Sequence, residues 1–371
     1  MYKQKLSLRD LLAKNYINAV GWNTKSKMVL IESDDWGSIR TASREAYETL
    51  LPDTKNKGDF FDEFDALEPA EDLERLYEVL SGVKDKNGHP FVMSPISIVA
   101  NPYFEAIEKN GFSEYVYESV LDTYKRSPET DKSYEVALEG IRDGIWNPQF
   151  HGREHINASR WLRVLQSGDA LNKKAFNLRS LNYGCLPSGI DYFRAFDIDT
   201  IDDLKQVNEV IVEGLKLFEK IWGYPATSFC APCSYVRQET IDIAASNGIK
   251  LTTGQYVSSL GNGSVKMNNK VWGSKSDRGI IFYRRNCKFE PARDHNIDWV
   301  DRCLSEIKIA FRWGKPAVID SHRVNYIGSI FPDNRDYTLK ELKRLLNEIV
   351  KRWPDVEFVN CEQIYKEIIG K

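Results

Sequence analysis

The chain has 371 residues, of which 42% are hydrophobic and 28% are charged, a balance typical of a globular protein. Its 51 basic and 54 acidic residues nearly cancel, so no excess of positive charge favours binding to nucleic acid. Six cysteines are too few for a disulfide scaffold, and no run of apolar residues is long enough for a membrane span. The first residues also lack the apolar core of a secretory signal. We therefore expect a cytoplasmic protein that acts neither on nucleic acid nor within a membrane.

Short apolar runs rich in β-forming residues alternate with amphipathic stretches along the chain. The apolar runs predict strands at 28–33, 91–100, 145–150, 227–230, 249–253, 279–285, 317–321 and 356–359. The amphipathic stretches predict helices at 70–83, 133–142, 158–166, 201–222, 238–246, 297–313 and 339–352. Because strands and helices alternate, the expected fold is α/β with parallel strands joined by right-handed crossovers. Seven or eight such units suit a closed barrel, and an open doubly wound sheet is the alternative.

Nothing in the sequence divides the chain into separate domains. It contains no internal repeat and no linker rich in Gly, Ser or Pro. The segments 40–70 and 169–200, which are rich in aromatic and acidic residues, are predicted to be insertions in loops. We therefore predict a single domain over residues 1–371.

Polar side chains follow five of the predicted strands. They are Asp34 and Asp35, His151 and His155, the segment 231–235, Arg285 and Asn286, and His322. In a parallel α/β fold the carboxyl ends of all strands meet on one face of the molecule. The five groups are therefore expected to form one site.

Two of the five histidines in the chain, His151 and His155, are four residues apart. On a helical turn this spacing would place them on one face, about 5–6 Å apart at Cβ. Asp34 and Asp35 supply a carboxylate to complete a metal site and a second carboxylate that can act as a base. A site of two histidines and one carboxylate leaves positions open for water and substrate, as metal-assisted hydrolysis requires. His322 is placed to protonate a leaving group.

Four segments, IESDDWG at 31–37, HGREH at 151–155, APCSY at 231–235 and DSH at 320–322, occur in the order of a known set of motifs. They resemble the motifs of the polysaccharide deacetylase family, which is carbohydrate esterase family 4 or the NodB homology domain. The resemblance spans about residues 28–325. It implies a distorted (β/α)7 barrel, a divalent metal that is most often zinc, and the removal of acetyl groups from a carbohydrate.

The resemblance also implies roles for individual residues. Asp34 would be the catalytic base, His322 the general acid, and Asp35, His151 and His155 the metal ligands. The backbone N–H of Tyr235 would face the oxyanion. Contacts with the carbohydrate are expected from residues at the same face, namely Trp36, Pro232, Tyr235, Arg285, Asn286 and Tyr326.

The sequence departs from the family pattern in two places. Trp36 stands between the aspartates and Gly37, and no arginine lies near Ala231, where the family has an arginine that tunes the base. The chain therefore resembles a divergent member of the family.

Four other interpretations are compatible with parts of the sequence. The spacing His151-x-x-Glu154-His155 also fits a zinc peptidase, provided that it lies in a helix. Cys230 and Cys233 have the spacing of a thioredoxin-type redox pair. A glycosidase on the same barrel would need a second carboxylate about 5–9.5 Å from that of Asp34. A barrel that only binds carbohydrate is the last alternative, although binding alone does not require two aspartates and three histidines.

Overall fold

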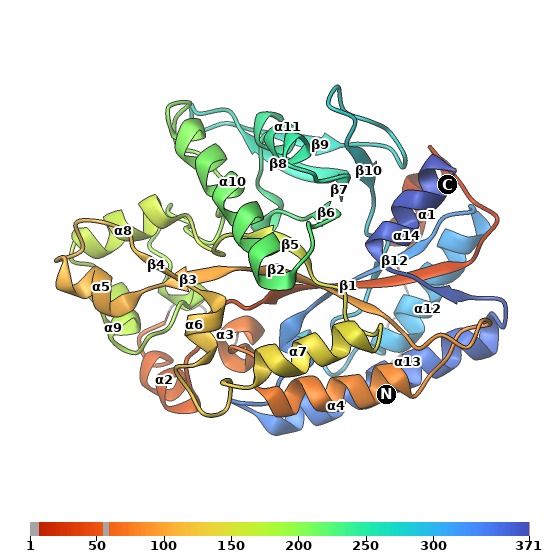
Figure 1. The fold of residues 1–371 in the computed structure, drawn as a ribbon, viewed down its shortest axis with the longest axis horizontal. Helices are drawn as coiled ribbons and strands as arrows, with labels where there is room; N and C mark the ends of the chain where they lie inside the picture. Colours follow the sequence, from red (N-terminus) through yellow and green to blue (C-terminus); the bar gives the residue numbers. More distant parts are fainter. Residues whose placement is uncertain (1–6, 55–58, 371) are drawn as a thin grey trace.

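The computed structural model describes residues 7–54 and 59–370, in which helices surround a curled parallel sheet (Figure 1). The strands of this sheet follow one another in the order β10-β7-β6-β5-β2-β1-β12-β11, and every neighbouring pair is parallel. Their bounds are β1 Met28–Trp36, β2 Met93–Ile98, β5 Gln149–Gly152, β6 Ser228–Phe229, β7 Leu251–Thr253, β10 Ile281–Tyr283, β11 Cys287–Lys288 and β12 Ala317–His322. A further short strand, β13 (Glu357–Phe358), pairs with the beginning of β1.

The two outer strands of this order, β10 and β11, are consecutive in the chain. Only residues 284–286 separate them, so one extended segment leaves the β7 edge and joins the β12 edge. Counted as one strand, β10 and β11 complete a barrel of seven parallel strands within the described residues. The predicted α/β class and distorted (β/α)7 barrel are thus confirmed.

The side chain of Asn286 holds this closing segment in place. Its Oδ1 accepts a hydrogen bond from the backbone N–H of Val318 (2.9 Å), and its Nδ2 donates to the carbonyl of Pro316 (2.9 Å) and to Oδ1 of Asn18 (2.8 Å). The side chain is fully buried, and these bonds satisfy its polar atoms inside the protein. The prediction that Asn286 contacts the substrate is therefore wrong.

Helices cover the outside of the sheet. In Figure 1, α4, α7 and α13 lie on one side, and α10 and α11 lie on the opposite side. The helices that the periodicity predicted are α4 Ala70–Ser81, α7 Ser133–Arg142, α8 Ala158–Gln166, α10 Asp203–Trp222, α11 Gln238–Ser246, α12 Trp299–Arg312 and α13 Pro332–Arg352. Those not predicted are α1 Leu8–Ala19, α2 Arg44–Leu50, α3 Phe60–Phe64, α5 Phe104–Lys109, α6 Val120–Tyr124, α9 Ala170–Asn177 and α14 Cys361–Ile369. None of the helices in the described residues is both long and apolar enough to cross a bilayer.

Two small antiparallel sheets of two strands each accompany the barrel. They are β3 (Ala100–Pro102) with β4 (Tyr117–Ser119), and β8 (Gln255–Ser259) with β9 (Val265–Asn269).

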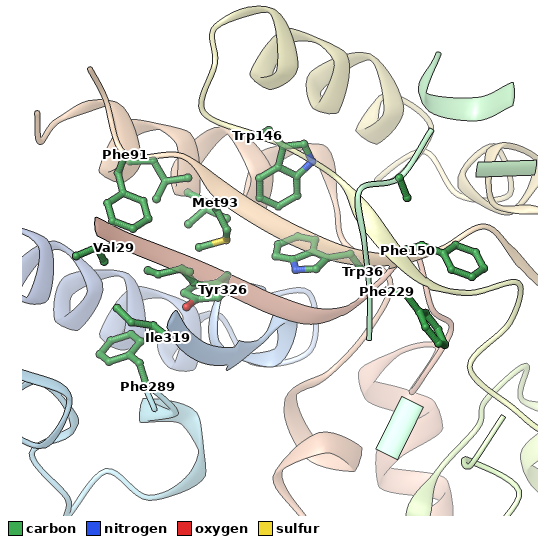
Figure 2. Close-up of a cluster of buried hydrophobic side chains, with 14 of the residues drawn as sticks. Val29, Trp36, Phe91, Met93, Trp146, Phe150, Phe229, Phe289, Ile319 and Tyr326 are labelled. Carbon is green, nitrogen blue, oxygen red and sulfur yellow. The ribbon is translucent and has the colours of Figure 1, made fainter. Parts of the chain in front are cut away.

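The largest hydrophobic cluster lies around β1 and includes two aromatic residues that were expected in the site (Figure 2). Trp36, which is 2% exposed, packs edge-on against Trp146 with ring centroids 4.7 Å apart, and its Nε1 donates to Oγ of Ser33. Tyr326 is fully buried, and its ring stacks parallel to that of Trp36 at 6.4 Å. Both rings therefore stabilise the core, and the prediction that they stack on a sugar is wrong.

The two predicted insertions pack against each other at one end of the barrel. Asn182 Nδ2 donates to Oγ1 of Thr41, and both oxygens of Asp62 accept backbone N–H bonds from Tyr183 and Gly184, each at 2.7 Å. Burial raises the pKa of the Asp62 carboxyl to about 6. These contacts fix the insertions as a wall beside the carboxyl ends of the strands.

Candidate active site

Asp34 and Asp35 lie at the end of β1, where the backbone departs from regular strand geometry. The register between β1 and β2 shifts between Ser33 and Trp36, and Asp35 has a φ of 78°. A bulge of this kind changes the direction of a side chain, whereas neighbours in a regular strand point to opposite faces. Both carboxylates consequently line the same cavity.

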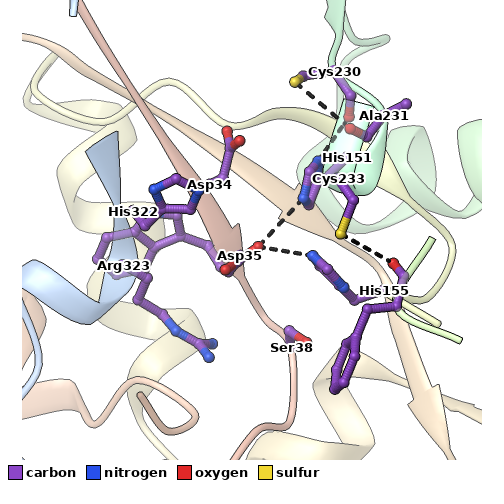
Figure 3. A network of polar contacts seen from close by, with 12 residues as sticks. Asp34, Asp35, Ser38, His151, His155, Cys230, Ala231, Cys233, His322 and Arg323 are labelled. Carbon is purple, nitrogen blue, oxygen red and sulfur yellow. Dashed lines mark hydrogen bonds and ion pairs between the residues drawn. The ribbon is translucent and has the colours of Figure 1, made fainter. Parts of the chain in front are cut away.

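Asp35, His151 and His155 form a compact buried cluster (Figure 3). Oδ1 of Asp35 lies 2.9 Å from Nε2 of His155 and 3.4 Å from Nε2 of His151. One oxygen and two imidazole nitrogens within 4.8 Å of one another could hold a single ion. This cluster matches the three metal ligands that the resemblance implied.

The protonation of this cluster suits a cation. Burial lowers the pKa of His155 to about 4, so its ring is neutral, as metal binding requires. Burial opposes ionisation of Asp35, but His155 and Arg40 beside it hold its pKa well below the usual value. Nδ1 of His151 lies 2.7 Å from the carbonyl of Cys230, which leaves the Nε2 lone pair directed at Asp35.

An unmatched polar atom also points to a bound cation. Nε2 of His151 is buried and makes no hydrogen bond within residues 7–54 and 59–370. A buried acceptor without a partner is costly, and a bound ion would remove this cost. The set of two nitrogens and one oxygen is one that zinc accepts, so the residues present fit a zinc ion.

The histidines reach this position without the helical turn that their spacing suggested. His151 belongs to β5, and His155 lies in an irregular segment before α8. The carboxylate of Glu154 is bound by Nε and Nη2 of Arg153 at 2.6 and 2.7 Å and does not line the cavity. The zinc peptidase interpretation needs a helix with a free glutamate and is therefore wrong.

A second set of potential ligands, Asp34, His151 and Cys230, shares one histidine with the first. Here the carboxylate is already engaged, because both oxygens of Asp34 accept hydrogen bonds from Arg285 at 2.7 and 2.8 Å. By contrast, Arg40 contacts Oδ2 of Asp35, and Oδ1 of Asp35 faces the two histidines. Burial also raises the pKa of the Cys230 thiol well above its usual value. The Asp35 cluster is therefore the better metal site.

Arg285 binds three carboxylates, and that of Asp34 is one of them. Besides Asp34, it binds Oε2 of Glu32 through Nε (2.6 Å) and Oδ1 of Asp320 through Nη1 (3.0 Å). Burial raises the pKa of Asp34, but Arg285 outweighs it and holds that pKa below the usual value. Arg285 lines a cavity, but most of its donors are already used.

His322 lies beside Asp34, because the two are register partners on the parallel strands β12 and β1. Its Nδ1 is 2.5 Å from Oε1 of Glu290, whose other oxygen accepts a hydrogen bond from Asn325. Burial opposes a charge on the imidazole, but Glu290 raises the pKa of His322 to about 10. At neutral pH His322 is therefore protonated, as a general acid must be.

Two adjoining cavities meet at Asp34, Cys233 and His322. The first, of about 160 Å³, contains the metal cluster and is lined by Asp34, Asp35, Phe60, Phe61, His151, His155, Tyr183, Cys233, Lys288, Glu290, Arg293 and His322. The second, of about 230 Å³, is lined by Asp34, Cys230, Ala231, Cys233, Ser234, Thr253, Gly254, Gln255, Arg284, Arg285, Asp320 and His322. Asp34 and His322 thus lie between the two cavities.

Pro232 and Tyr235 line neither cavity. Pro232 is buried at the start of a 3₁₀ turn, and the backbone N–H of Tyr235 donates to its carbonyl at 3.3 Å. The ring of Tyr235 is covered by the guanidinium of Arg194, 3.9 Å from the ring centroid. The structure therefore does not present these two residues to a substrate or an oxyanion.

The cysteines of this region do not form a redox pair. Cys230 and Cys233 are both free thiols. Burial raises the pKa of the Cys230 thiol, whereas a reactive thiol of the thioredoxin type has a lowered pKa.

No protein-family model and no curated protein matches the chain. Among solved structures, the fold is similar to a protein assigned as a polysaccharide deacetylase from Mycobacterium smegmatis, with 13% identity, a TM-score of 0.44 and coverage of 95% of this chain and 93% of that chain. It is also similar to 4-α-glucanotransferase from Thermococcus litoralis, with 9% identity, a TM-score of 0.42 and coverage of 94% and 40%. A third is a carbohydrate esterase family 4 pseudoenzyme from Bacillus anthracis, with 10% identity, a TM-score of 0.36 and coverage of 89% and 63%. At these identities the likeness concerns the fold.

Proposed function

We propose that the protein is a metal-dependent hydrolase that removes N- or O-acetyl groups from a carbohydrate. The observation that carries this proposal is that the cluster of Asp35, His151 and His155 lines one cavity together with Asp34 and His322. Such a cavity offers a metal position, an ionised carboxylate and a protonated imidazole to the same bound molecule.

The roles follow from the charge of each group. A zinc ion held by the three ligands would polarise the acetyl carbonyl and favour ionisation of water. Asp34, kept ionised by Arg285, accepts the proton of the attacking water. His322, kept protonated by Glu290, donates its proton to the sugar nitrogen or oxygen as the bond to the acetyl carbon breaks. The products are acetate and the free amino or hydroxyl sugar.

The environment of the other carboxylates favours deacetylation over glycoside cleavage. Glu32 and Asp320 are bound to Arg285, and Glu290 is bound to His322. Each of the carboxylates that surround Asp34 therefore has a cationic partner. A glycosidase needs a protonated carboxyl group as its acid, and such a partner disfavours protonation.

We also infer that residues 1–371 act as one domain in the cytoplasm. The wall made by 40–70 and 169–200 packs directly on the strand ends that carry the site. All six cysteines are free thiols, as in proteins of a reducing compartment.

The test is acetate release by zinc-loaded protein from N-acetylchitotetraose and from acetylated xylotetraose. We expect acetate without new reducing ends, loss of activity after treatment with a chelator, and recovery when zinc is returned. New reducing ends would indicate a glycosidase instead. Saturable binding of the oligosaccharides without any product would indicate a barrel that only binds carbohydrate. Asp35→Asn is the matched control, because it removes one charge from the metal cluster and keeps the size of the side chain.

A further inference from the structure

The cavity that contains the metal cluster is lined by three acidic residues. Each of them contacts a cationic side chain or the histidines of the cluster. Asp34 is bound by Arg285, Glu290 by His322, and Asp35 lies against Arg40 and the two histidines. Charges that are compensated in this way contribute little to the field at the centre of the cavity. Arg285 is shared among Glu32, Asp34 and Asp320, so the compensation on the Asp34 side is incomplete, and further cations of the wall add to the charge that a bound molecule meets.

Two cations of this wall, Lys288 and Arg293, have no such compensation among the residues that the structure describes. Within the described parts of the chain, neither forms an ion pair with a carboxylate. Lys288 ends β11 and is half-buried, and its backbone N–H is held by Oε2 of Glu306 at 2.7 Å. Arg293 is exposed at the end of the turn Pro291–Arg293. Both side chains line the cavity that holds the metal cluster.

Aromatic rings complete the same wall. Phe60, Phe61 and Tyr183 are half-buried, and the ring of Phe61 lies 5.1 Å from that of His322 and 5.8 Å from that of Tyr183. The guanidinium of Arg293 lies 6.0 Å from the centroid of Phe60. Aromatic faces pack against the apolar faces of sugar rings, while unpaired cations attract a negative group beside them.

We propose that the substrate is an anionic carbohydrate, in which a sugar bearing a carboxylate or sulfate group is attached to the acetylated sugar. Lys288 and Arg293 bind the negative group, and Phe60, Phe61 and Tyr183 contact the sugar ring. The proposal rests on the proposed deacetylase function for the removal of the acetyl group. The binding of an anionic carbohydrate does not depend on that function. Because a zinc ion would add further positive charge, loading the site strengthens the preference for an anion.

The test compares three probes that share N-acetylglucosamine. N-acetylchitotetraose is neutral, a hyaluronan tetrasaccharide alternates N-acetylglucosamine with glucuronate, and 6-sulfated N-acetylchitotetraose carries sulfate. We expect kcat/KM for at least one anionic probe to exceed that for the neutral probe by about tenfold or more at low salt. The ratio of kcat/KM for the anionic and neutral probes should fall in roughly 0.5 M NaCl, because salt at this concentration strongly screens exposed charges. The two anionic probes distinguish a carboxylate from a sulfate site.

The variants Lys288→Gln/Arg293→Gln and Lys288→Glu/Arg293→Glu assign the preference to these side chains. The ratio of kcat/KM for the anionic and neutral probes should fall towards one in the first variant and below one in the second. Lys216→Glu/Lys220→Glu is the matched control for Lys288→Glu/Arg293→Glu. It changes the net charge by the same amount as that variant, at two exposed residues of α10 outside the cavity. In this control the ratio should stay as in the wild type.

Binding titrations of the zinc-loaded protein with the same probes separate this proposal from the deacetylase function. Tighter binding of an anionic probe without acetate release would contradict the deacetylase function and support the anionic site. Acetate release with equal kcat/KM for neutral and anionic probes would contradict the anionic site alone. A preference that survives in Lys288→Glu/Arg293→Glu would also overturn it.

Discussion

Asp34 and Asp35 are neighbours in the chain, yet they belong to two halves of the site with different chemistry. On the Asp35 side, one carboxylate faces two buried imidazoles, and Nε2 of His151 makes no hydrogen bond within the described residues. On the Asp34 side, the carboxylate is held through both oxygens by Arg285, and His322 is held by Glu290. Arg285 thus engages both oxygens of Asp34, whereas Arg40 contacts Oδ2 of Asp35 and Oδ1 faces the two imidazoles.

This difference shows how two adjacent, chemically identical side chains acquire separate roles. A metal ion is stabilised where a carboxylate oxygen and imidazole nitrogens converge, and it is disfavoured where a guanidinium already binds both oxygens of the carboxylate. The bulge at Asp35 makes the separation possible, because it brings both carboxylates to one cavity with different neighbours. Substitutions on each side should therefore have distinguishable effects.

The largest effect is expected from Asp34→Asn. The amide cannot accept the proton of the attacking water, so kcat should fall by about 10³-fold, within the range typical of general-base catalysis. Zinc content should stay at the wild-type value, because Asp34 is not among the proposed ligands. Acetate release and metal content are measured on the same preparation. A variant that loses zinc together with activity would contradict the separation of roles.

Arg285→Met is expected to destabilise the fold. Without the guanidinium, the carboxylates of Glu32, Asp34 and Asp320 remain close together without a cation, which should cost about 3–5 kcal/mol in the free energy of unfolding. The loss should be greater at pH 8 than at pH 5, because protonation of these groups relieves their repulsion at low pH. Urea denaturation at the two pH values measures both effects. Arg285→Lys, which retains the charge, is the control, and equal losses in the two variants would contradict the electrostatic explanation.

His322→Gln tests the acid on the Asp34 side. Loss of the proton donor should lower kcat by about 10²-fold for an N-acetyl sugar, whose amine leaves only when protonated. For p-nitrophenyl acetate, whose phenolate leaves without a proton, the loss should be much smaller. Equal losses for the two substrates would show that His322 does not act as the acid.

Arg40→Met tests whether Arg40 positions Asp35 for metal binding. Nη2 of Arg40 donates to Oδ2 of Asp35 at 3.3 Å, and its guanidinium lies 4.5 Å from the ring centroid of Phe193. Loss of such a support for a metal ligand should weaken zinc binding by about 10–100-fold, as measured by competition with a chelator. Arg40→Lys should lose less affinity. Unchanged zinc affinity in Arg40→Met would show that Arg40 stabilises the fold and does not affect metal binding.

The smallest effect concerns the stability of the metal-free protein at alkaline pH. The folded-state pKa of His322, about 10, is above the unfolded value of 6.5, so its contribution is complete below about pH 6.5 and is lost as the pH rises towards 10. The wild-type melting temperature should therefore fall by roughly a few degrees between pH 7 and pH 10. His322→Gln should show a smaller fall, and an identical fall would contradict the pairing with Glu290.

Long periodic segments of the fold could be predicted from the sequence. The bounds predicted for α7, α8 and α11 agree with the structure, because each helix buries one regular apolar face. The short helices of the insertions, such as α2 and α3, contain too few turns for a period to show. The closure of the barrel by residues 284–286 was also not predicted. It depends on which strands lie at the two edges of the sheet, and the sequence does not give this order.

The aspartates and histidines that line the cavity could be predicted more fully than the residues that hold them. Two aspartates and three histidines were found because strand ends of a parallel fold meet on one face. Glu290 and Arg40 were missed, because their roles depend on contacts with residues that are distant in the chain or on a bulge. Arg285 was predicted at the site, but its three carboxylate partners could not be deduced from spacing. The aromatic residues at strand ends were misassigned where packing buried them.

The most direct test is the zinc content of the wild type, Asp35→Asn and Asp34→Asn after reconstitution and removal of free metal, measured by mass spectrometry. The separate roles of the two aspartates predict about one zinc per chain in the wild type and in Asp34→Asn, and less than about 0.2 in Asp35→Asn. Equal zinc content in the two variants, or no zinc in the wild type, would contradict the assignment of Asp35, His151 and His155 as the metal site.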